Sequence, residues 1–151
     1  MVIDTKMFDD QYFMQQALRE AHKAFENGEV PVGAVVVVND RIITRAHNLT
    51  ETLNDVTAHA EMQAITAAAN MLGGKYLTDC TLYVTIEPCP MCAGALRWAQ
   101  ISRVVYGAPD EKRGYTQISP YLLHPKTIVT SGILGDDCAN LMKLFFARVR
   151  K

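Results

Sequence analysis

A pair of cysteines between an apolar run and a helix-like segment constrains the fold of this chain most. Residues 81–86 read Thr-Leu-Tyr-Val-Thr-Ile, and Glu-Pro-Cys-Pro-Met-Cys follows, which places the two thiols at Cys89 and Cys92. If a helix starts at Pro90, its positions i and i+3 lie on one face of the first turn. The backbone N–H groups and the positive dipole end at that start favour thiolate over thiol. The stretch therefore predicts a buried strand that leads directly into a helix carrying two sulfur ligands.

A second motif upstream adds an imidazole and a carboxylate, in the sequence Ala58-His59-Ala60-Glu61. Two thiolates and one imidazole suit Zn²⁺. Structural zinc sites are closed by four protein ligands, whereas catalytic sites keep one position for water. Three candidate ligands, His59, Cys89 and Cys92, therefore indicate an enzyme. Because positions i and i+2 of an ideal helix point about 200° apart, Glu61 is poorly placed as a fourth ligand. We expect it instead to reach a water molecule at the open position.

The composition is that of a globular protein and excludes several classes. The chain has 151 residues, about one domain (1–151), and its 49% hydrophobic and 21% charged content argues against disorder. No apolar stretch approaches the roughly 18 residues of a membrane span. The N-terminal residues lack the apolar region and cleavage site of a signal peptide. We therefore expect a cytoplasmic protein with reduced cysteines, in which Cys80 and Cys138 are small buried residues.

The formal net charge of −1 excludes a global field that attracts nucleic acid. A local basic patch is still available at the C-terminus, because residues 141–151 contain lysines and arginines but no acidic residue.

Apolar periodicity predicts a regular alternation of helices and strands after an N-terminal helix and a hairpin. Two β-rich runs around Asn39-Asp40 form the hairpin, and Thr57 is expected to cap the second helix. The alternation fits an α/β fold, a three-layer α/β/α sandwich with a five-stranded mixed sheet. The expected helices are 9–26, 57–72, 90–100 and 136–150, and the expected strands are 32–38, 41–46, 81–86, 103–107 and 126–131.

Two features of this pattern concern close contacts. Gly33 and Ala34 lie at the start of the hairpin and have little side chain, so either a ligand or a packed helix can approach the backbone there.

The second and third helices are apolar nearly all round, and the third carries Trp98. Because such helices are buried on more than one side, we expect a homodimer.

These motifs resemble those of the cytidine deaminase-like superfamily, and within it those of the bacterial tRNA-specific adenosine deaminases. The resemblance covers almost the whole chain and rests on segments 29–35, 57–61, 81–95, 103–108, 132–134 and 145–146. It implies that His59, Cys89 and Cys92 bind one zinc ion per chain. It also implies that Glu61 is the proton shuttle and that the side-chain amide of Asn48 holds the target base.

The same resemblance implies a function, the conversion of adenosine to inosine at the wobble position of a tRNA anticodon. The target base would be flipped out of the anticodon stem-loop into the pocket. Glu61 would then take a proton from the attacking water and pass it to the ring nitrogen and the leaving amine. The expected phosphate contacts come from basic residues, Lys112, Arg113, Arg148 and Arg150.

Two departures keep a second substrate class open. After residues 110–114 the tRNA-editing pattern continues with small residues, whereas this chain continues with the bulkier segment 115–120. In addition, Arg97-Trp98-Ala99 resembles the guanine deaminase branch, which acts on a free base. The alternative substrate is therefore a small-molecule purine or nucleoside, of the guanine, cytosine or adenosine type.

A third possibility is a non-catalytic zinc-binding module. It requires a fourth protein ligand, and the available residues are His47, His124 and Cys80.

Overall fold

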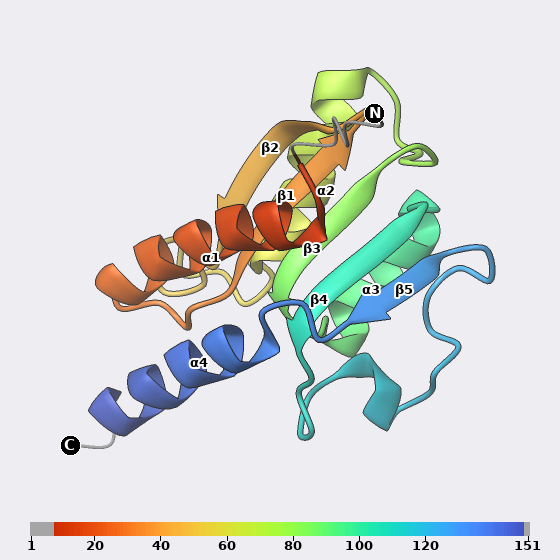
Figure 1. Ribbon diagram of the computed structural model, residues 1–151. Coiled ribbons are helices and arrows are strands. Elements are labelled where there is room, and N and C mark those ends of the chain that lie inside the picture. The colour runs from red at the N-terminus through yellow and green to blue at the C-terminus, as the bar shows by residue number, and fades with distance from the viewer. Residues whose placement is uncertain (1–7, 150–151) are drawn as a thin grey trace, which may run out of the picture.

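A five-stranded sheet lies between two pairs of helices in the computed structural model, which describes residues 8–149 (Figure 1). Helices α1 and α4 cover one face, and α2 and α3 cover the other. The predicted three-layer sandwich is thus confirmed. The helices are α1 Asp10–Glu26, α2 Ala60–Leu72, α3 Pro90–Ala99 and α4 Gly135–Val149, with a short 3₁₀ helix at Tyr115–Gln117; the strands are β1 Gly33–Val38, β2 Arg41–His47, β3 Thr81–Ile86, β4 Arg103–Ala108 and β5 Ile128–Ser131.

The sheet is mixed, with the strand order β2-β1-β3-β4-β5. Strand β1 runs antiparallel to both β2 and β3, while β3, β4 and β5 are parallel. Side chains of β3 alternate between the two helical layers, so Val84 packs with the α2 and α3 side and Tyr83 with the α1 and α4 side. Because both faces are covered, β1, β3 and β4 are apolar at nearly every position.

The hairpin between β1 and β2 forms as the sequence predicts. Asn39 and Asp40 have φ angles of 51° and 61°, the left-handed values that a two-residue turn matching the strand twist requires. Gly33 at the start of β1 packs against α1, because a Cβ atom there would lie 2.1 Å from the carbonyl oxygen of Ala17. Of the two interpretations of this glycine, helix packing is therefore the correct one.

The predicted cap of the second helix is wrong, because α2 begins three residues later than Thr57. The hydroxyl of Thr57 donates to the Asp55 carboxylate at 2.7 Å, so it is not available to the helix. The backbone stays extended up to His59, which occupies the N-cap position with φ −69° and ψ 154° and makes no side-chain cap. The imidazole of His59 is consequently left free for another partner.

A buried carboxylate, Glu29, holds the loop that connects β2 to α2. Its side chain is completely buried and accepts hydrogen bonds from the backbone N–H of Glu51 at 3.0 Å and from the N–H and hydroxyl of Thr52, both at 2.6 Å. Burial alone would raise the pKa of Glu29, but these bonds and one from Thr50 hold it below its ordinary value of 4.5.

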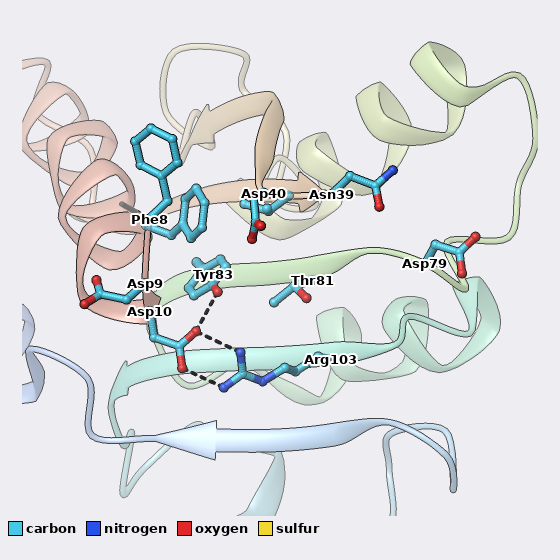
Figure 2. Close-up of a pocket in the computed structure, with 11 residues that line it drawn as sticks. Phe8, Asp9, Asp10, Asn39, Asp40, Asp79, Thr81, Tyr83 and Arg103 are labelled. Atoms are coloured by element: carbon cyan, nitrogen blue, oxygen red, sulfur yellow. Dashed lines mark hydrogen bonds and ion pairs between the residues drawn. The ribbon is translucent and has the colours of Figure 1, made fainter. Parts of the chain in front are cut away.

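An ion pair ties the start of α1 to the sheet, as Figure 2 shows. The Asp10 carboxylate accepts two hydrogen bonds from the Arg103 guanidinium, at 2.8 and 2.7 Å, and one from the Tyr83 hydroxyl at 2.6 Å. Arg103 also donates to the hydroxyl of Thr130 in β5 at 3.0 Å. The network therefore joins α1, β3, β4 and β5 in one pocket, lined in part by Asp79.

None of the helices described between residues 8 and 149 has the length and apolar character that crossing a bilayer requires.

Replacing Asp10 should destabilise the fold. In D10N the ion pair with Arg103 is lost, and both side chains are about one-third exposed, so we expect a loss of about 1–2 kcal/mol of unfolding free energy in urea titrations. The control is D79N, which changes an exposed carboxylate in the same pocket. Equal stability of D10N and the unsubstituted protein would contradict the structural role given to this network.

Replacing Glu29 should change how stability depends on pH. A folded-state pKa below 4.5 means that the charged carboxylate stabilises the protein above that pH, and that this contribution is lost as the pH falls through the lowered pKa. The protein should thus be more stable than E29Q at neutral pH, and the difference should shrink on acidification. Urea midpoints across an acidic pH series measure this, with E26Q at the exposed end of α1 as control. A pH-independent difference would refute the charge-based explanation.

Candidate metal centre and active site

Three ligand atoms from two helix starts meet at one point. His59 immediately precedes α2, Cys89 is the N-cap of α3, and Cys92 lies in the first turn of α3. The Nδ1 atom of His59 is 3.6 Å from the Sγ of Cys89 and 3.4 Å from the Sγ of Cys92. In tetrahedral zinc sites, with bonds of about 2.0–2.3 Å, neighbouring nitrogen and sulfur ligands are separated by about 3.6 Å. The geometry of the three side chains therefore fits a zinc ion.

The protonation of the two thiols also fits a bound cation. Hydrogen bonding from Cys92, together with His59, holds the pKa of Cys89 at about 4, well below its ordinary value. The pKa of Cys92 is raised instead, by its bond to Cys89 and by burial. Only one sulfur therefore ionises readily, because a second negative charge beside the first is unfavourable. A divalent cation removes this penalty and allows both to bind as thiolates.

Glu61 lies beside the three ligands but not among them. It is in the first turn of α2, its side chain is only 4% exposed, and it contacts the thiol of Cys92. Burial raises the pKa of its carboxyl to about 7. Because α2 begins at Ala60, His59 is extended while Glu61 is helical, and both side chains can face the same site despite their i, i+2 spacing. Its catalytic role stays a prediction.

The residues that a structural zinc site would need are engaged elsewhere. Nδ1 of His47 is 3.5 Å from the Glu20 carboxylate, and Nδ1 of His124 accepts a hydrogen bond from the Lys126 N–H at 3.1 Å. Cys80 is buried in the core between the sheet and the α2 and α3 layer. Among residues 8–149, the ligand atoms of His59, Cys89 and Cys92 form the one such group of three or more. Within the described part of the chain no fourth protein ligand joins this group, as a catalytic zinc site with a water ligand would require.

Asn48 lies at the end of β2, next to the segment that carries His59. Its side chain is 7% exposed, and its amide makes two hydrogen bonds of 3.4 Å, one to the carbonyl of Val30 and one from the N–H of Thr50. The following residue, Leu49, donates its N–H to the carbonyl of Ala58 at 3.0 Å. Asn48 is thus attached to the His59 turn, and its long hydrogen bonds are weak. Its contact with a base remains a prediction.

The predicted phosphate contacts that lie within residues 8–149 do not form one patch. Lys112 and Arg113 are exposed on a turn whose backbone N–H groups both bond to the carboxylate of Asp110, at 3.1 and 3.0 Å. Arg148 is exposed near the end of α4, where its guanidinium lies 5.4 Å from the centre of the Phe25 ring. Figure 1 places this end of α4 well apart from the 3₁₀ helix that follows the Lys112 turn. Arg150 lies outside the described residues.

Sequence reasoning assigned no role to Glu87, which directly precedes the Pro88-Cys89 turn. Its side chain is 4% exposed, and both carboxylate oxygens accept hydrogen bonds from the loop after β4. The signal for it was the position itself, an acidic residue between a buried strand and a metal ligand. The contacts could not be foreseen, because they come from residues 23 to 29 positions away.

The chain is similar to known proteins over most of its length. Residues 7–108 match the family model of the cytidine and deoxycytidylate deaminase zinc-binding region. The chain is 46% identical to a tRNA-specific adenosine deaminase of Bacillus subtilis (strain 168), over 96% of this chain and 93% of that protein.

Solved structures agree with this similarity. One, from work on A-to-I editing by tRNA:A34 deaminases at the wobble position of transfer RNA, has a TM-score of 0.80 and 44% identity, covering 86% of this chain and 98% of the other. A guanine deaminase from Bacillus subtilis has a TM-score of 0.66 and 37% identity, covering 76% and 71%. With the geometry of the three candidate zinc donors, these matches show that the chain belongs to the cytidine and deoxycytidylate deaminase family of zinc-dependent hydrolases.

Proposed function

We propose that this protein converts adenosine to inosine at the wobble position of a tRNA anticodon. The observation that carries the proposal is the near full-length similarity to a tRNA-specific adenosine deaminase, at 46% identity. The chemistry of the site is consistent with it, because three zinc donors and a buried carboxylate converge at the starts of α2 and α3. We infer a cytoplasmic location from the same proposal.

The residues of the chain have separate parts in the reaction. Zinc held by His59, Cys89 and Cys92 would supply a Lewis acid that makes a water molecule more acidic. Because two thiolates offset the charge of the metal, a nearby base is needed, and Glu61 is the buried carboxylate in reach. Glu61 accepts a proton from the attacking water and delivers it to the adenine ring nitrogen. Glu61 then takes the proton of the new C6 hydroxyl and passes it to the amine. As the bond between C6 and the amine breaks, ammonia leaves and the C6 carbonyl of inosine remains.

Recognition of the substrate is assigned to the surroundings of the metal centre. Asn48 orients the flipped base through its side-chain amide. Lys112 and Arg113 contact phosphates of the anticodon loop, because they are exposed on the turn after β4. Arg148, near the end of α4, would contact a more distant part of the tRNA, and Arg150 stays a predicted phosphate contact.

A second candidate is the deamination of a free purine base. The similarity to a guanine deaminase at 37% identity supports it. A further observation is Tyr115, which stands where the tRNA-editing pattern has small residues. Its side chain is 3% exposed, so it fills space next to the site that smaller residues would leave open.

The proposal includes a homodimer. Helices α2 and α3 expose large apolar side chains, with Trp98 82% and Met71 65% exposed. An apolar surface of this kind favours association, and a second copy of the chain would cover it.

Removal of the Glu61 carboxylate should separate metal binding from catalysis. We expect E61A to keep one zinc ion per chain, because the three donors are unchanged, and to lose at least about 10²-fold in turnover. Zinc content by atomic emission and inosine formation by chromatography measure the two effects. The comparison variant C92A should lose zinc and activity together. An active E61A would show that another group moves the proton.

The substrate class can be decided by ammonia release. A panel of free bases, nucleosides and an arginine tRNA anticodon stem-loop should give the highest kcat/KM with the stem-loop. Because Lys112 and Arg113 would each displace counterions from phosphates, the KM for this RNA should rise steeply with salt, with a logarithmic slope of about −0.7 per contact for the affinity. Preference for a free purine, with a salt-insensitive KM, would favour the second candidate.

A further inference from the structure

The Glu87 carboxylate accepts hydrogen bonds from the loop between β4 and β5, and no step of the proposed mechanism uses this residue. Oε1 accepts a hydrogen bond from the N–H of Asp110 at 3.2 Å. Oε2 accepts two bonds from Thr116, from its N–H at 3.0 Å and from its hydroxyl at 2.8 Å. The carboxylate therefore holds both ends of the segment 110–116, which carries Lys112 and Arg113 at its middle.

The charge of Glu87 makes this contact hard to replace. No salt bridge to Glu87 is formed within residues 8–149, so the loop donors are the groups that compensate its burial. A buried carboxylate without such donors is strongly unfavourable. The loop and the carboxylate consequently depend on each other, and an open loop would leave the charge uncompensated.

The loop is also fitted closely to Glu87. A Cβ atom at Gly114 would lie 2.1 Å from Oε2 of Glu87 and 2.6 Å from the carbonyl oxygen of Asp110. The N–H of the next residue, Tyr115, donates to the carbonyl of Pro88 at 2.9 Å. Because Pro88 precedes the zinc donor Cys89, the loop is attached directly to the turn that forms the metal centre.

We propose that Glu87 is a positioning residue for substrate binding: it fixes segment 110–116 beside the metal centre, so that Lys112 and Arg113 meet the phosphates of the RNA. The proposal rests on the proposed function. It assigns Glu87 no contact with the reacting atoms, so its loss should affect RNA binding rather than the chemical step.

The test uses two variants that disturb the same contact from opposite sides. E87Q removes the charge and one of the two accepting oxygens, and G114A forces the loop away from an intact Glu87. The control is D10N, which alters a carboxylate at the opposite end of β3 and β4 and weakens the fold there. For each protein, zinc content, amide hydrogen exchange of residues 110–117, and kcat and KM with the anticodon stem-loop are measured.

We expect both E87Q and G114A to keep zinc and a kcat within about twofold of the unsubstituted protein, with KM raised about tenfold, the size of one charge-assisted hydrogen bond. Amides in 110–117 should exchange faster in both variants and at the original rate in D10N.

Three results would overturn the proposal. Loss of zinc or a large fall in kcat in both variants would mean that Glu87 supports the metal turn instead. Faster exchange with an unchanged KM would mean that the loop does not bind RNA, and unchanged exchange would mean that Glu87 does not hold the loop. If the unsubstituted protein leaves the stem-loop unmodified, the proposed function fails, and the exchange rates alone then decide whether Glu87 fixes the loop.

Discussion

The arrangement of one imidazole and two thiols around a single point is the constraint on which the structure depends. The imidazole nitrogen is 3.4–3.6 Å from the two sulfurs, and all three atoms lie within 4.8 Å of one another. At such a separation two thiolates would repel each other without a cation between them. Each donor sits where an extended segment turns into a helix, so its direction is set by the first turn rather than by a flexible side chain. The sheet and the helices α2 and α3 hold those turns in place, because β3 runs directly into the cysteine turn and α2 packs against β1 and β2.

Three buried glutamates show how one residue type serves different ends. Glu29 and Glu87 each accept several hydrogen bonds from the backbone and hydroxyls of a loop, which fix the carboxylate in place. In Glu29 these bonds also hold the pKa below 4.5. Glu61 is equally buried, but its neighbours are His59 and the cysteines. Burial raises the pKa of its carboxyl to about 7, and its part as a proton shuttle belongs to the proposed function.

Most of the elements could be predicted because local patterns agree with the final contacts. The Asn39-Asp40 turn, the strand 81–86 and the helix start at Pro90 each follow from the residues themselves. The cap at Thr57 was wrong because Asp55 competes for its hydroxyl. The last strand begins at Ile128 and not at residue 126, because the N–H groups of Lys126 and Thr127 bond back to His124. Both errors come from short-range hydrogen bonds that periodicity does not detect.

The sequence by itself determined the candidate zinc ligands: two cysteines three positions apart at a helix start and a histidine upstream form a donor set that suits Zn²⁺. A glutamate two residues after that histidine is the predicted base. It also determined the layered α/β fold, since short apolar runs typical of buried strands alternate with segments of 3.6-residue hydrophobic period. Only the tertiary structure decided how the site is enclosed. Glu29 holds the loop after Asn48, and Glu87 holds the loop that carries Lys112, while Arg148 lies apart from both loops. These arrangements depend on contacts between residues far apart in the chain. Such contacts are set by the packing of whole elements, which no local pattern encodes.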